Sequence, residues 1–120
     1  FVCKICDFLE KNIKANQSVA ERAKAYVEAH YADSSLTLDR VASEMRISPN
    51  YFSALFKQNT GSSFINYLTN VRIAKAKELL RSGSCKTYEV AMRCGYENPT
   101  YFSTIFKRRT GVSPSEYRGE

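Results

Sequence analysis

The chain has 120 residues, 43% of them hydrophobic, and a formal net charge of +6, which suits one ordinary domain or two very small ones. It has no apolar run long enough to cross a membrane and no signal-peptide pattern, so we expect a soluble, cytoplasmic protein. The basic surplus suits a polyanionic partner, although solubility alone can also account for it.

The N-terminal part of the sequence has a helical pattern. Residues 2–14 carry a one-sided apolar stripe, which fits either a helix of its own or the end of a connector. The chain begins with Phe1 rather than methionine, so we expect residues 1–17 to be a helical linker from an upstream domain. A second helix is predicted to begin at Ser18, because Ser18 and Glu21 form a capping box.

Helical patterns also fill the rest of the chain, and no strand pattern has comparable weight. Hydroxyl or amide N-caps, prolines at first helical positions and stop glycines mark the helix ends. Helices are predicted over 38–45, 49–58, 64–82, 87–94 and 99–109, with a short last helix after Ser113. The fold class predicted is all-α, with two helix-turn-helix subdomains, 18–63 and 83–120, joined by a linker helix over 64–82.

One stretch occurs twice, as PNYFSALFK at 49–57 and PTYFSTIFK at 99–107. The likeness extends to 49–68 and 99–118, which share ten of twenty residues without a gap. Two copies are fewer than stacked solenoids need. The repeat therefore predicts a pair of modules that present the same surface twice.

Each repeated helix has one apolar face and one small polar face. Phe52, Leu55 and Phe56 should be buried in the first copy, and Phe102, Ile105 and Phe106 in the second. The opposite faces carry Asn50, Ser53, Ala54 and Lys57, and Thr100, Ser103, Thr104 and Lys107. Small polar side chains with a terminal lysine favour a helix that reads the major groove of DNA. The alternatives are an ordinary solvated face or a helical protein–protein interaction module without DNA readout.

The predicted linker helix has a length that suits two reading helices on one duplex. A helix of nineteen residues is about 28 Å long, and successive major grooves on one face of B-DNA are roughly 34 Å apart. Two recognition helices held by such a rod could enter successive major grooves without dimerisation.

The sequence gives little support for a metal site, a cofactor or an enzyme. Cys3 and Cys6 have the spacing of a zinc half-site, but Cys85 and Cys94 do not provide a matching half, and His30 is the one histidine. No histidine–nucleophile pair, glycine-rich phosphate loop or carboxylate cluster is present. We expect reduced structural thiols, no metal, no cofactor and no enzymatic activity.

Two stretches resemble one known family closely. GYENPTYFSTIFKRRTGVSPSEYR at 95–118 and RIAKAKELL at 72–80 are similar to the DNA-binding domain of AraC/XylS-type transcription regulators, over residues from about 20 to 118. Ser-Pro-Asn-Tyr-Phe in the first copy and the long helical lead-in are similar to the output domains of two-component response regulators of this family. The resemblance implies a bacterial regulator that binds double-stranded promoter DNA and RNA polymerase. It also implies no membrane partner, a monomeric isolated domain and a parent protein that can be dimeric.

The resemblance also implies roles for individual residues. Base edges would be contacted by Asn50, Ser53, Ala54, Asn98, Thr100, Ser103 and Thr104. The DNA backbone would be contacted by Lys57, Lys107, Arg108, Arg109 and the half-packed Tyr51 and Tyr101, while Arg72 fits either a phosphate contact or helix packing. Many members of the family have arginine where this chain has Ala54 and Thr104. Without that guanine contact, we expect methyl contacts, single hydrogen bonds and DNA shape to matter more.

Overall fold

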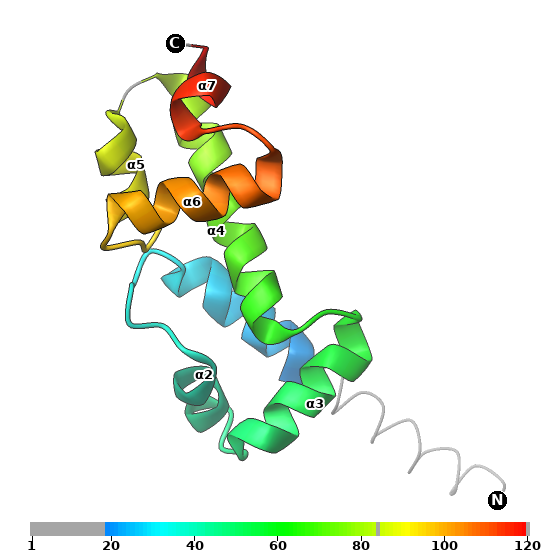
Figure 1. Cartoon of the computed structure of the whole chain (residues 1–120). Coiled ribbons are helices and arrows are strands. Elements are labelled where there is room, and N and C mark those ends of the chain that lie inside the picture. The colour runs from blue at the N-terminus through cyan, green and yellow to red at the C-terminus, as the bar shows by residue number, and fades with distance from the viewer. Residues whose placement is uncertain (1–18, 84, 120) are drawn as a thin grey trace, which may run out of the picture. The chain divides into compact units, whose positions relative to one another are not determined.

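The computed structural model describes residues 19–83 and 85–119, and within these ranges it is all-helical with no strand (Figure 1). This confirms the predicted fold class. The predicted linker over 1–17, the cap at Ser18 and the Cys3–Cys6 pair lie outside the described residues. Residues 19–30 are helical, and six labelled helices follow: α2 Leu38–Glu44, α3 Pro49–Thr60, α4 Phe64–Ser82, α5 Thr87–Arg93, α6 Pro99–Thr110 and α7 Pro114–Arg118.

The described residues form two compact units, each containing one helix-turn-helix. Among the described residues, the first unit consists of 19–29 together with Thr37–Tyr67, and it contains α2 and α3. The second unit consists of His30–Leu36 together with the chain from Leu68 onward, and it contains α5, α6 and α7. The boundary between Tyr67 and Leu68 falls inside α4. The short segment 30–36 thus folds with residues that come much later in the sequence.

The predicted helix starts are confirmed by their N-cap hydrogen bonds. Ser48 Oγ accepts from the Tyr51 N–H at 3.2 Å at the start of α3, and Ser113 Oγ accepts from the Glu116 N–H at 3.1 Å at the start of α7. At the start of α6, Asn98 Oδ1 accepts from two backbone N–H groups. Because these side chains satisfy donors that have no partner within the helix, they fix where each helix begins.

Helices α3 and α6 end two residues and one residue later than predicted, respectively, and for the same reason. Thr60 Oγ1 lies 2.8 Å from the Phe56 carbonyl oxygen, and Thr110 Oγ1 lies 2.8 Å from that of Phe106. The glycine that follows each threonine adopts a left-handed conformation, and its N–H donates to the carbonyl of the lysine four residues earlier. These bonds extend the last turn as far as the threonine.

Aromatic side chains form the centre of each unit. In the first unit, Phe52, Phe56 and Phe64 are fully buried, with ring centroids 5.4–5.8 Å apart. In α4, the spacing of Ile65 and Leu68 is that of an apolar helix face, but Ile65 is exposed and Phe64 is fully buried. In the second unit, Phe102 and Phe106 lie 5.7 Å apart, and Tyr117 contacts Phe106.

The two described cysteines belong to the core of the second unit. Cys85 and Cys94 carry thiols that are not in a disulfide, and both are buried among Val90, Ala91 and the aromatic rings. Burial raises the pKa of the Cys94 thiol to about 11, so that thiol is protonated at neutral pH. This environment is typical of a packing residue.

Candidate nucleic-acid interface

The two reading helices α3 and α6 share their starts, their ends and their buried faces. Phe52, Leu55 and Phe56 of α3 are buried, as are Phe102, Ile105 and Phe106 of α6. Both sets match the sequence prediction. Each helix is packed by its apolar face, so the opposite face is turned outward in its own unit.

The predicted base-contacting residues lie on these outward faces. Asn50, Ala54, Thr100 and Thr104 are exposed, whereas Ser53 and Ser103 are half-buried. Thr104 Oγ1 donates to the Thr100 carbonyl at 3.1 Å, which leaves its oxygen as an acceptor. The first helix has Ala54 at this position and offers a methyl group instead.

Asn98 caps α6 through two hydrogen bonds within its own unit. Its Oδ1 accepts from the Thr100 N–H at 2.9 Å and from the Tyr101 N–H at 3.2 Å. The amide oxygen is therefore occupied by the cap, and the amide NH₂ is the group that can face a base edge.

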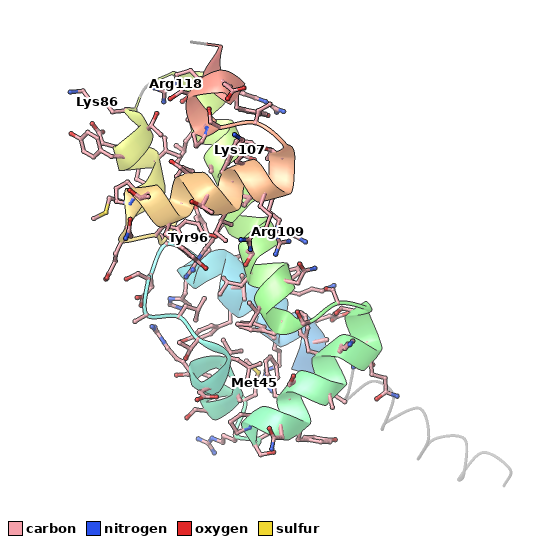
Figure 2. The ribbon with its side chains drawn as sticks, viewed as in Figure 1. Met45, Lys86, Tyr96, Lys107, Arg109 and Arg118 are labelled. Carbon is pink, nitrogen blue, oxygen red and sulfur yellow. The ribbon has the colours of Figure 1, made fainter. Side chains whose placement is uncertain are left out.

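Positive charge is concentrated at the C-terminal ends of the reading helices. The last turn of α3 has one basic residue, Lys57, and the last turn of α6 has three, Lys107, Arg108 and Arg109. All four are exposed, although Arg109 Nη1 donates to Asn70 Oδ1 at 2.7 Å (Figure 2). The second reading helix thus carries a larger positive charge than the first.

Tyr51 and Tyr101 are half-exposed, as expected for side chains packed on one side only. Their exposed fractions are 54% and 56%. The ring of Tyr101 lies against that of Tyr96, with centroids 6.1 Å apart.

Arg72 is a buried residue of the second unit, with an exposed fraction of 8%. Its Nε donates to the Tyr31 carbonyl and its Nη2 to the Asp33 carbonyl, each at 3.0 Å. The guanidinium also lies 5.4 Å from the centroid of the Tyr96 ring. Burial lowers the pKa of Arg72, and the neighbouring Tyr96 and Asp33 oppose this. Of the two roles that the sequence left open for Arg72, this environment supports packing, and a phosphate contact stays a prediction.

The turn before each reading helix has a residue with a positive φ angle, but the two turns differ. Arg46 has φ 59° in the first unit and Gly95 has φ 91° in the second. A Cβ on Gly95 would lie 2.4 Å from the Tyr31 carbonyl oxygen and 2.9 Å from Arg72 Nε. Glycine is therefore required in the second turn by its neighbours, whereas an exposed arginine is tolerated in the first.

Segment 30–36 supports the second turn, and no pattern in the sequence predicts this. The carbonyls of Tyr31 and Asp33 accept hydrogen bonds from Arg72. In addition, Ser34 Oγ donates to Glu97 Oε1 at 2.7 Å. Ser34 and Glu97 are 63 residues apart, and no periodicity or motif connects them. The available signal was an arginine on the apolar side of α4, which requires acceptors from some other part of the chain.

The matched helix pairs define a tandem helix-turn-helix protein. A helix-turn-helix domain family matches residues 41–120. The chain is 41% identical over 103 residues to the HTH-type transcriptional regulator YijO of Escherichia coli K12, an alignment that covers 86% of this chain and 36% of YijO. Here the chain spans about a third of the length of this relative. It belongs to the AraC-type helix-turn-helix family of DNA-binding transcription regulators.

Solved structures have the same fold. The C-terminal domain of AraT, a response regulator from Geobacillus stearothermophilus, is 46% identical with a TM-score of 0.82, and 83% of each chain is covered. The DNA-binding domain of the global transcriptional factor AdpA, solved with a target DNA, is 28% identical with a TM-score of 0.78. That comparison covers 82% of this chain and 88% of the AdpA chain.

Across the described part of the chain, every helix is too short or too polar to span a bilayer.

Proposed function

We propose that this chain binds double-stranded promoter DNA in a sequence-specific manner, with α3 and α6 in successive major grooves. The observation that carries the proposal is the detailed match between these helices in caps, buried faces and outward polar faces. The nineteen residues of α4 give a helix of about 28 Å, compared with roughly 34 Å between major grooves on one face of the duplex. That length supports binding to successive grooves.

Base edges are contacted in this proposal by the outward side chains of the first turns. These are Asn50, Ser53 and Ala54 in the first unit, and Asn98, Thr100, Ser103 and Thr104 in the second. Lys57, Lys107, Arg108 and Arg109 contact phosphates, with Tyr51 and Tyr101 beside the backbone. Because none of the base-contacting residues is arginine, readout relies on single hydrogen bonds, methyl contacts and DNA shape.

A salt titration of DNA binding tests this function. Four to six phosphate contacts give a slope of roughly −4 to −5 in a plot of log K against log salt concentration. Fluorescence anisotropy with a duplex selected from a random pool measures that slope, and hydroxyl-radical footprinting should show two protected patches about ten base pairs apart. A flat salt dependence, or a single patch, would count against the proposal.

For the whole protein, we propose an intracellular regulator of transcription that also contacts RNA polymerase. Tyr88 and Met92 of α5 support a protein partner, because they are 54% and 55% exposed and lie four residues apart on one helix. The substitution Met92→Ser, which leaves the net charge unchanged, should reduce transcription in vitro while leaving the anisotropy curve unchanged. Equal loss in both assays would assign Met92 to folding or DNA binding instead.

The similarity to the AraT domain supports a further proposal, that this chain is the output domain of a two-component response regulator. The isolated domain would then be monomeric, and pairing of DNA-bound copies would depend on the rest of the protein. Analytical ultracentrifugation of this chain tests the first point. A concentration-dependent dimer would show that the described domain contains an interface of its own.

A further inference from the structure

Two basic residues, Lys86 and Arg46, occupy positions where the other unit has a residue that suits the local backbone better. The N-cap of the helix before the reading helix is Thr37 in the first unit and Lys86 in the second, and the turns contain Arg46 and Gly95. The same spacing of 49 residues separates Thr37 from Lys86 and Arg46 from Gly95. Thr37 is therefore the residue with which Lys86 is compared, and Gly95 is the residue with which Arg46 is compared.

Lys86 is an unfavourable N-cap. Thr37 Oγ1 accepts from the Arg40 N–H at 3.2 Å, whereas Lys86 makes no side-chain cap bond, because an ammonium group cannot accept one. A cation at a helix N-terminus also opposes the helix dipole. Figure 2 shows Lys86 pointing away from the helices of its unit. Its position thus weakens α5, and its side chain is exposed.

Arg46 is also unfavourable where it stands. Its φ of 59° is a left-handed backbone conformation that residues other than glycine, asparagine and aspartate adopt at a cost. Arg46 is exposed, and the structure records no side-chain hydrogen bond, ion pair or ring contact for it among the described residues. Packing does not explain why arginine rather than glycine is present.

Charge at these two positions fits the proposed DNA-binding function, on which this inference rests. In helix-turn-helix complexes the first helix crosses the phosphate backbone, and Lys86 stands at the start of that helix in the second unit. In the first unit, Arg46 precedes α3 and Lys57 lies in its last turn, so positive charges stand at both ends of the reading helix. Between Pro49 and Lys57, α3 rises by about 12 Å, which is close to the width of the major groove.

We propose that Lys86 and Arg46 are additional phosphate contacts, retained at the expense of local stability. The decisive variants copy the other unit: Lys86→Thr adds an N-cap, and Arg46→Gly relieves the backbone strain. Each should leave the thermal midpoint of the whole chain unchanged or a few degrees higher. Each should also lower the salt slope of binding to a random-sequence duplex by about one and weaken binding to all sequences alike.

Controls separate this inference from the proposed function. Lys86→Arg and Arg46→Lys keep the charge and should restore the slope. Lys86→Gln and Arg46→Asn remove the charge by another route, should either copying variant fail to fold. If these charge-removing variants leave the slope unchanged while Lys107→Ala lowers it, the inference is overturned and the proposed function stands. If Lys107→Ala also changes nothing and binding ignores salt, the proposed function itself fails.

Discussion

The first and second units contain nearly the same reading helix, but they support it differently. In the first unit the turn before α3 is exposed and tolerates Arg46. In the second unit the turn before α6 is buried against the Tyr31 carbonyl and Arg72, which requires Gly95. The difference shows that the buried face and the caps constrain the sequence of a repeated helix from within the repeat. The residue in the preceding turn is constrained by neighbours outside the repeat.

The largest effect in this comparison is expected from the buried phenylalanines. Phe56→Ala and Phe106→Ala should each destabilise the chain by about 3–5 kcal/mol, because each removes a fully buried ring. The loss should be greater for Phe56, whose ring contacts those of Phe52, Phe64 and Tyr67. Urea unfolding followed by circular dichroism gives both values, and a change near zero would refute the assignment of buried faces.

Substitution of the glycines should separate the second turn from ordinary helix ends. Gly95→Ala is expected to cost about 2–5 kcal/mol, from the positive φ angle together with the clash with Tyr31. Gly61→Ala shares the positive φ angle but has nothing within 4 Å of the added Cβ, so it should cost about 1–2 kcal/mol. Equal costs in thermal unfolding would mean that segment 30–36 does not restrict the turn.

The N-caps of the reading helices provide a smaller contrast. Asn98→Ala removes an acceptor for two N–H groups, and Ser48→Ala an acceptor for one. Loss of a cap costs about 0.5–2 kcal/mol of stability. We expect Asn98→Ala to lie near the upper end of this range and Ser48→Ala near the lower end. The comparison requires denaturation curves for both variants, with Ser115→Ala, an exposed residue inside α7, as a neutral control.

Substitutions on the outward faces of α3 and α6 should have little effect on stability. They should distinguish residues that read base edges from residues that contribute only charge. Ser103→Ala should change the order of preferred duplexes, with about 1 kcal/mol of altered discrimination. Lys107→Ala should weaken all duplexes alike and lower the salt slope by about one. Binding to a duplex library measures both effects. The reverse result, with Lys107 selective and Ser103 uniform, would mean that the outward faces are misassigned.

Most of the helices and buried faces were predictable because their signals are local. Ser48-Pro49, Asn98-Pro99 and the glycines after each helix mark ends within a few residues, and the apolar spacing identifies Phe52 and Phe102 as core. The small polar residues and lysines of the site follow from the opposite faces of the two helices, whereas Asn98, Arg108 and Arg109 follow from the family resemblance. Their contacts with DNA remain predictions.

What could not be predicted involves residues that are distant in sequence or lack a pattern. Arg72 was compatible with packing and with phosphate binding, since its partners are backbone carbonyls that any residue could provide. Ile65 fitted the apolar periodicity of α4, but the aromatic ring of Phe64 fills the core instead. The positive φ angle of Arg46 had no signal in its residue type.

The membership of segment 30–36 in the second unit has a practical and an evolutionary consequence. A fragment cut at the unit boundary inside α4 would leave the buried guanidinium of Arg72 without its two carbonyl acceptors. The second half therefore cannot be expressed alone as a clean truncation, although its repeat suggests an independent module. The two units are interlaced along the polypeptide, so recombination that exchanged one unit for another would have to carry a short upstream stretch with it.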